Sequence, residues 1–87
     1  MNSPSAIDNL QKLIDAFSRS IDVDQRDDIL RAQYRQTKGW DSVAHMRLVG
    51  EIEAEFDVML DTDDVIAMSS FDKARQILTR YDVQLES

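Results

Sequence analysis

The chain has 87 residues, a formal net charge of −7 and no cysteine. A chain of this length forms one domain with a single core, spanning residues 1–87, and without cysteine it has no disulfides or thiolate chemistry of its own. The acidic balance argues against a nucleic-acid binder, because affinity for a phosphate backbone depends on clustered lysine and arginine. No apolar stretch approaches the roughly 20 residues that cross a bilayer. The polar start lacks the features of a signal peptide, so we expect a cytoplasmic protein without membrane insertion.

Apolar residues recur at helical spacing near the start of the chain: Ile7, Leu10, Leu13, Ile14, Phe17 and Ile21. This pattern predicts a first amphipathic helix over about residues 4–19. From about residue 20 to 41 the periodicity weakens, which predicts a long, partly ordered loop with room for a helical turn around Asp27 to Tyr34.

Leu48, Val49, Ile52 and Phe56 then share one face of a second helix, predicted over about residues 42–56 with Ile52 and Phe56 turned inward. Asp61 or Thr62 can cap a short third helix over about 62–67, and Ser69 or Ser70 a fourth over about 70–81. The expected fold is all-α: a small four-helix bundle with a long loop between helices 1 and 2 and a short third helix.

Ser42 is the first candidate site residue. The sequence Gly39-Trp40-Asp41 favours a turn, so Ser42 lies in the first turn of the second helix. Backbone N–H groups there have no intrahelical acceptor and the helix dipole leaves partial positive charge, which would partly neutralise a phosphate on the Ser42 hydroxyl. The simpler interpretation is that Asp41 or Ser42 only caps the helix, since both residue types are favoured caps.

The segment from Leu48 to Asp72 holds eight acidic residues and no lysine or arginine. Such a run usually forms a solvated face, but it can also form a docking surface for basic partners. A calcium loop of the EF-hand type is excluded by spacing, because the chain has Ile66 and Asp72 where that loop needs glycine and glutamate. We therefore expect no metal site.

His45 is the single histidine, so a Ser-His-Asp hydrolase would have to combine it with Ser42 and Asp41. Positions this close on one helix offer no separate oxyanion hole or substrate cleft. We expect no catalytic residues, with His45 as a partly exposed rim residue and Trp40 packed against the end of the bundle.

The chain resembles the acyl carrier proteins. Asp41-Ser42-Val43 is similar to the Asp-Ser-Leu signature of that family, and the run from Leu48 to Phe56 is similar to its Leu-x-x-x-(Leu/Ile)-Glu-x-Glu-Phe pattern. The segment Leu60-Asp61-Thr62-Asp63-Asp64 matches the apolar-acidic-acidic segment before the family's third helix. The resemblance covers essentially the whole chain and is strongest from Gly39 to Leu78.

The resemblance implies a bundle of the acyl-carrier type and a 4′-phosphopantetheine group on Ser42, with Asp41 as the adjacent motif residue. A phosphopantetheinyl transferase would attach the group from coenzyme A. The implied protein is a non-catalytic monomer that carries acyl groups as thioesters between an acyl-loading enzyme and a synthase or acyltransferase. The implied partner-docking residues on the second helix are Val43, Met46, Arg47, Gly50, Glu53 and Ala54.

Arg47, Gly50 and Ala54 depart from fatty-acid carriers, which show an acid, an apolar side chain and a second acid at these places. With the Gly-Trp-Asp-Ser entry and His45, the chain looks more like discrete carriers of specialised-metabolite or surface-polysaccharide pathways than those of bulk fatty acid synthesis. Two alternatives stay open: an aminoacyl (peptidyl-type) carrier, and an unmodified helical interaction module that uses the same acidic face.

Overall fold

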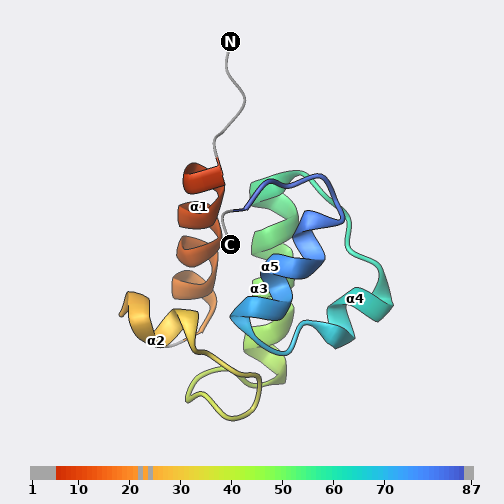
Figure 1. Cartoon of the computed structure of the whole chain (residues 1–87). Coiled ribbons are helices and arrows are strands. Elements are labelled where there is room, and N and C mark those ends of the chain that lie inside the picture. The colour runs from red at the N-terminus through yellow and green to blue at the C-terminus, as the bar shows by residue number, and fades with distance from the viewer. Residues whose placement is uncertain (1–5, 22, 24, 86–87) are drawn as a thin grey trace.

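The computed structural model describes residues 6–21, 23 and 25–85, which form five helices (Figure 1). The helices are α1 (Ala6–Ser20), α2 (Arg26–Leu30), α3 (Ser42–Phe56), α4 (Thr62–Ala67) and α5 (Phe71–Thr79). Strand-type pairing within these residues is limited to one bridge between Gln33 and Ser70, so the prediction of an all-α protein is confirmed. The Cα radius of gyration is 11.9 Å, close to the roughly 12 Å of a compact domain of this length.

The helices pack around a single hydrophobic core. α1 runs down the molecule in Figure 1 and α3 runs back up beside it, while α5 lies in front of α3 and α4 at the right. α2 packs against α1 and α5 at the lower end, where the connection into α3 also lies. Both α2 and the start of α3 are therefore at the same end of the molecule. None of the described helices is long and apolar enough to span a membrane.

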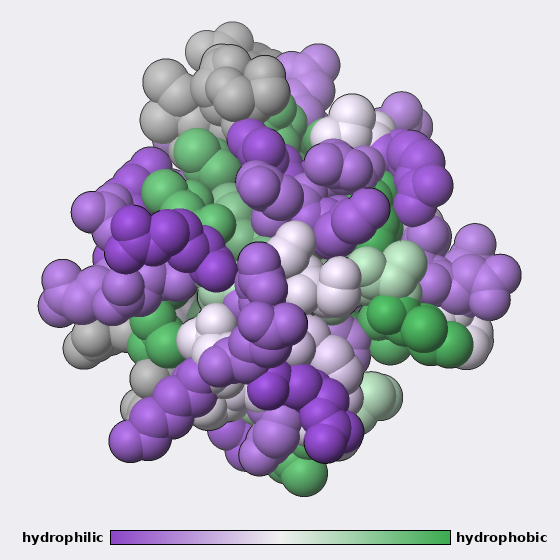
Figure 2. All heavy atoms as spheres, turned by 60° about the horizontal axis from the view of Figure 1, so that its bottom comes forward, coloured by the Kyte–Doolittle hydropathy of each residue, from purple (hydrophilic) through white to green (hydrophobic). Residues whose placement is uncertain are grey.

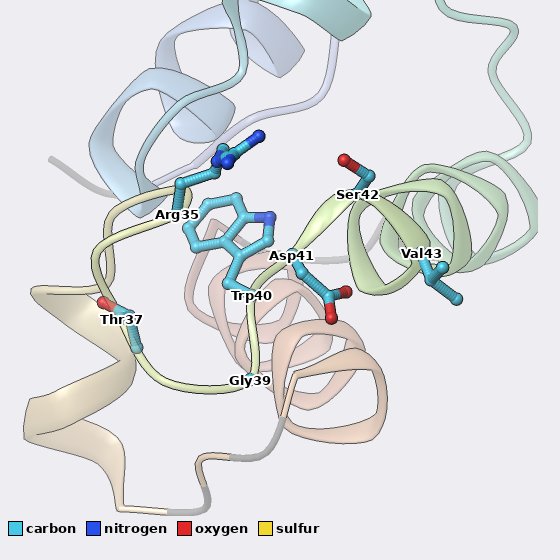
Figure 3. Close-up of a pocket in the computed structure, with 7 residues that line it drawn as sticks. All are labelled: Arg35, Thr37, Gly39, Trp40, Asp41, Ser42 and Val43. Atoms are coloured by element: carbon cyan, nitrogen blue, oxygen red, sulfur yellow. The ribbon is translucent and has the colours of Figure 1, made fainter.

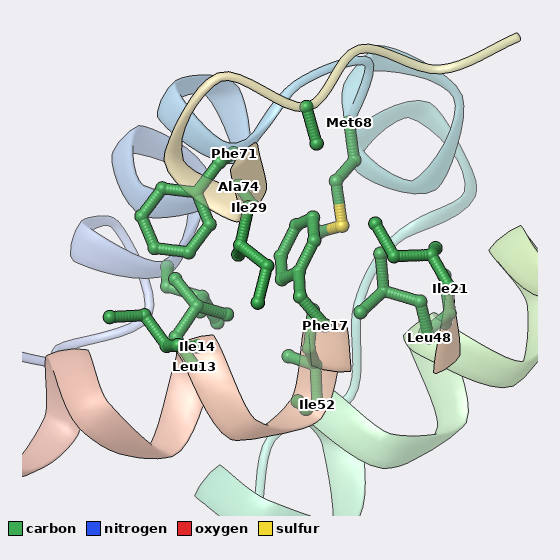
Figure 4. Close-up of a cluster of buried hydrophobic side chains, with 14 of the residues drawn as sticks. Leu13, Ile14, Phe17, Ile21, Ile29, Leu48, Ile52, Met68, Phe71 and Ala74 are labelled. Carbon is green, nitrogen blue, oxygen red and sulfur yellow. The ribbon is translucent and has the colours of Figure 1, made fainter. Parts of the chain in front are cut away.

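Phe17 of α1 is the central side chain of the core. Its ring lies edge-on to Trp40 at a centroid distance of 5.2 Å and tilted against Phe71 at 5.0 Å. Figure 4 shows side chains of α1, α3 and α5 converging around it. The largest fully buried side chains are Trp40, Phe17, Phe71, Leu13, Ile29, Leu48, Ile52, Met68 and Leu78. Because these come from helices and connections alike, the core is shared by nearly every segment of the chain.

The connection between α1 and α3 is more ordered than predicted. α2 forms inside it, and Ile29, Ala32 and Trp40 are each only 1 % exposed. The predicted loop over about 20–41, with its helical turn around Asp27 to Tyr34, therefore contains a fifth helix that begins at Arg26 and overlaps the expected turn. A helix as short as α2 contributes too few apolar residues to show helical periodicity, and its stability comes from packing Ile29 into the core.

α5 is shorter than the predicted helix over about 70–81. Ser70 caps its start by accepting a hydrogen bond from the Lys73 N–H at 3.0 Å, and the last helical residue is Thr79. Beyond it the chain turns at Asp82, which has a φ of 65°, and the Val83 N–H donates to the Leu78 carbonyl. A left-handed residue ends a helix in this way because it redirects the following N–H groups to the last free carbonyls.

Ile52 and Phe56 differ in burial although the sequence placed both on the inward face. Ile52 is 0 % exposed, whereas Phe56 is partly exposed at the last turn of α3. We predict that Ile52→Ala lowers the free energy of unfolding by about 2–5 kcal/mol, the range for truncating a buried aliphatic side chain. Phe56→Ala should cost less, because part of its ring already contacts water.

Chemical denaturation followed by circular dichroism measures both changes. Met59→Ala is the matched control, because Met59 is 83 % exposed and exposed substitutions stay within about 0.5 kcal/mol. Equal losses for Ile52→Ala and Phe56→Ala would contradict this assignment of the core.

Candidate functional site

Asp41 caps the start of α3. Its backbone is extended, with φ −105° and ψ −171°, and its carboxylate accepts a hydrogen bond from the Ala44 N–H at 2.9 Å. Its carbonyl accepts the His45 N–H at 2.8 Å and so begins the helical ladder. Asp41, not Ser42, is therefore the capping residue. Ser42 occupies the first helical position with a hydroxyl that does not serve the cap.

The Ser42 side chain is exposed at the rim of an open depression. In Figure 3 the Ser42 hydroxyl and the Asp41 carboxylate point in different directions, and the Arg35 side chain extends past the Trp40 ring on the side of the Ser42 hydroxyl. The depression has a volume of about 430 Å³ and is lined by Arg35, Thr37, Gly39, Trp40, Asp41, Ser42 and Val43. Its open form leaves room for a group attached to Ser42.

Tyr34 provides a second contact that sequence reasoning missed. Its hydroxyl lies 3.1 Å from the Ser42 Oγ, and either oxygen can donate the hydrogen. Tyr34 is the only aromatic residue in the polar stretch from Gln33 to Lys38, and this is the one feature of the sequence that distinguishes it from its neighbours. Its neighbour Arg35 adopts a left-handed backbone with φ 66°, and its N–H donates to the Trp40 carbonyl at 2.9 Å. The hydrogen bond between Arg35 and Trp40 closes the loop and so brings Tyr34 and Arg35 close to Ser42.

Trp40 and His45 form a buried pair beneath the site. Trp40 Nε1 donates to His45 Nδ1 at 3.0 Å, and the two rings are stacked with centroids 5.9 Å apart. The indole can only donate, so His45 Nδ1 accepts and the proton of the neutral ring is on Nε2. That nitrogen lies 2.8 Å from the Val65 carbonyl and donates to it. The pair therefore links the loop to α3 and to α4.

The prediction of His45 as a partly wet rim residue is wrong, because the side chain is buried with 8 % exposure. Sequence spacing placed it near Ser42, but its partners are Trp40 and Val65. With both ring nitrogens engaged in these bonds, His45 is not placed to take a proton from the Ser42 hydroxyl.

Most of the residues proposed for partner docking lie on the outer face of α3. Val43 and Met46 are 69 % and 63 % exposed. Exposed positions also include Arg47, Gly50 and Ala54. A Cβ atom at Gly50 would meet nothing within 4 Å, so packing inside the chain does not require glycine there. This face is accessible over its whole length.

Glu53 differs from the other docking residues. Its side chain is partly buried, and its carboxylate accepts a hydrogen bond from the Leu60 N–H at 2.9 Å. This contact ties the end of α3 to the connection before α4. Glu53 thus has a structural role in holding that connection.

The acidic run is partly neutralised within the molecule. Arg19 of α1 pairs with Glu51 at 3.0 Å and Glu55 at 3.5 Å, and Arg80 pairs with Asp64 at 2.7 Å. Asp64 also accepts a hydrogen bond from the Tyr81 hydroxyl, which raises the pKa of Tyr81. Such exposed pairs add little stability, but they reduce the free negative charge of the surface. Among the described residues no group of histidine and acidic side chains is arranged to hold a metal ion.

The end of the molecule that carries the loop and the start of α3 has a mixed surface. Figure 2 turns this end toward the viewer and shows mainly hydrophilic atoms with separate hydrophobic patches. The exposed large apolar side chains of the described residues are Val43, Met46, Met59 and Ile66. Two of them, Val43 and Met46, belong to the first turns of α3 and lie closest in sequence to Ser42.

Comparison with known proteins found no match, neither to a protein-family model, nor to a curated protein, nor to a solved structure. A functional assignment therefore depends on the residues and geometry described above.

The hydrogen bond between Trp40 and His45 gives a prediction about stability. His45→Ala removes the acceptor of a buried indole N–H, which should lower the free energy of unfolding by about 1–3 kcal/mol. Denaturant unfolding monitored by circular dichroism measures the loss. Arg47→Ala, an exposed substitution on the same helix, should change stability by less than about 0.5 kcal/mol. A His45→Ala protein as stable as the wild type would show that the indole N–H has another acceptor.

Proposed function

We propose that this protein is an acyl carrier protein that holds 4′-phosphopantetheine on Ser42. The observation that carries the proposal is the separation of roles at the start of α3. Asp41 performs the capping, and the neighbouring Ser42 hydroxyl is exposed at the rim of an open depression. Because Asp41 provides the cap, the Ser42 hydroxyl is not needed for it and is available for modification.

The residues around Ser42 fit a phosphodiester. The first N–H groups of a helix lack intrahelical acceptors and favour an anion at this end. Arg35 lines the same depression, and within the described part of the chain it takes part in no ion pair. Its guanidinium can therefore neutralise a phosphate without losing another carboxylate partner. The terminal thiol of the arm would supply the group that carries an acyl chain as a thioester.

Attachment would proceed on a phosphopantetheinyl transferase with coenzyme A as the donor. The Ser42 Oγ forms a bond to the phosphorus next to pantetheine while the pyrophosphate P–O bond breaks. Adenosine 3′,5′-bisphosphate leaves with the bonding electron pair, and the serine proton passes to a base of the transferase. Any magnesium ion required for this transfer belongs to the transferase.

On this proposal α1, α3, α4 and α5 are the four helices of an acyl-carrier bundle, and α2 is a short addition in the loop. The carrier is a cytoplasmic monomer and a substrate of its partner enzymes, namely an acyl-loading enzyme and a synthase or acyltransferase. Its exposed α3 face, with Val43, Met46 and Arg47, would meet these partners. An aminoacyl carrier would use the same site and differ only in its cargo and loading enzyme.

The face of α3 favours a specialised-metabolite or surface-polysaccharide pathway over bulk fatty acid synthesis. Arg47 is exposed and, among the described residues, has no ion-pair partner. Of the acids that follow it on α3, Glu51 and Glu55 pair with Arg19, and Glu53 accepts the Leu60 N–H. The surface of α3 beyond Arg47 is thus less acidic than the sequence indicates. It would suit a partner that carries an acid opposite Arg47.

Loading of Ser42 is the direct test of the carrier function. Incubation with coenzyme A and a broad-specificity phosphopantetheinyl transferase should add the mass of one phosphopantetheine, and Ser42→Ala should abolish the addition. Intact-protein mass spectrometry measures both. Ser69→Ala is the matched control, because Ser69 is also exposed but lies outside a helix start. If several transferases add nothing to a folded wild-type protein, the unmodified interaction module becomes the better account.

Charge reversal at Arg47 tests the assignment of the pathway. The loaded wild-type protein should be a poor substrate for a fatty-acid ketoacyl synthase or malonyl transferase, because Arg47 repels the basic patches of such enzymes. Arg47→Glu, alone or with Ala54→Glu, should raise kcat/KM, and the gain should shrink as salt screens the charges. Efficient turnover of the wild type, or no effect of charge reversal, would place this carrier in ordinary fatty acid synthesis.

A further inference from the structure

Tyr34 is held in place independently of Ser42. Its N–H donates to the Ser69 carbonyl at 2.8 Å, next to the bridge between Gln33 and Ser70. Its ring lies 4.9 Å from the His45 ring and 6.1 Å, edge-on, from Trp40. Both of those rings are buried and hydrogen-bonded to each other. The Tyr34 hydroxyl is therefore presented from a fixed ring.

This hydroxyl faces the reactive oxygen of the proposed site. Tyr34 Oη and Ser42 Oγ are 3.1 Å apart, within hydrogen-bonding distance. A free serine side chain samples three staggered rotamers, and a fixed partner selects one of them. Asp41 already satisfies the Ala44 N–H, so the serine is not drawn toward the helix cap. The bond to Tyr34 thus orients the Ser42 oxygen toward the Tyr34 side of the site.

Esterification of Ser42 would change the chemistry of this contact. The Ser42 Oγ would lose its hydrogen and could no longer donate, whereas the Tyr34 O–H keeps its hydrogen. Phosphate oxygens carry negative charge, and hydrogen bonds to charged acceptors are roughly twice as strong as those between neutral groups. The same tyrosine hydroxyl can therefore serve the serine first and the phosphate afterwards.

We propose that Tyr34 is a positioning residue for Ser42, whose hydroxyl holds the serine oxygen before phosphopantetheine is attached and donates to the attached phosphate afterwards. The second half of this inference rests on the proposed carrier function. The first half concerns the unmodified protein and can be tested without any loading reaction.

A double-mutant cycle tests the contact in the unmodified protein. Tyr34→Phe and Ser42→Ala, alone and combined, should be non-additive by about two- to five-fold in the unfolding equilibrium constant, as for residues in direct contact. Tyr81→Phe is the matched control, because its hydroxyl bonds instead to Asp64 and to the Asp61 N–H. Tyr81→Phe combined with Ser42→Ala should be additive. Additivity in both pairs would overturn the first half of the proposal.

Loading kinetics and phosphorus NMR test the second half. Tyr34→Phe should lower the kcat of phosphopantetheine attachment by about five-fold with little change in KM, the effect of losing one neutral hydrogen bond to the nucleophile. In the loaded protein, the ³¹P resonance of the phosphodiester should shift in Tyr34→Phe but not in Tyr81→Phe. The shift should disappear in urea, where no tertiary contact remains.

These outcomes separate the inference from the proposed function. Failure of the wild-type protein to load would overturn the carrier function and the second half of the inference together, while the double-mutant cycle would still decide the first half. A wild type that loads, with an unchanged kcat and ³¹P resonance in Tyr34→Phe, would overturn the role of Tyr34 and leave the carrier function intact.

Discussion

Burial of Trp40 is the constraint on which the arrangement of this protein depends. A large aromatic side chain with an N–H group can be buried only where that donor finds an acceptor. Here the ring packs edge-on against Phe17 of α1, and its Nε1 donates to His45 of α3. His45 in turn donates to the Val65 carbonyl of α4. One indole therefore joins the loop, α1, α3 and α4. A substitution that disrupts one of these contacts should weaken the others as well.

The candidate site is a consequence of this anchoring. Trp40 immediately precedes Asp41, so fixing the indole fixes where α3 begins and which side chain caps it. Because Asp41 takes the capping role, the Ser42 hydroxyl is left at the surface. The rings of His45 and Trp40 also contact the ring of Tyr34, whose hydroxyl lies within hydrogen-bonding distance of the Ser42 Oγ. A rigid aromatic base beneath an open rim would suit the carrier function that we propose, in which a partner enzyme must reach Ser42.

The negative charge that is concentrated between Leu48 and Asp72 in the sequence is partly neutralised in the folded protein. The acidic run loses much of its free charge to neighbours, since Arg19 pairs with Glu51 and Glu55 and Arg80 pairs with Asp64. Glu53 is directed to the Leu60 N–H. Arg35 and Arg47 form no ion pairs among the described residues, and each lines a depression that also includes Asp41 and Val43 at the start of α3. The proposed partners would therefore meet a site with local positive charge on an acidic protein.

The sequence by itself determined the helical class, the range of α3 and the place of Ser42, because helical spacing and turn residues act over only a few positions. It indicated only a helical turn around Asp27 to Tyr34 and not the bounds of α2, whose five residues have too little pattern and depend on burying Ile29. Nor could it show that His45 is buried or that Tyr34 reaches Ser42, since neither contact follows from the periodicity of a helix. The tertiary structure decided these points, because a buried polar group takes its partners from whichever segments pack around it.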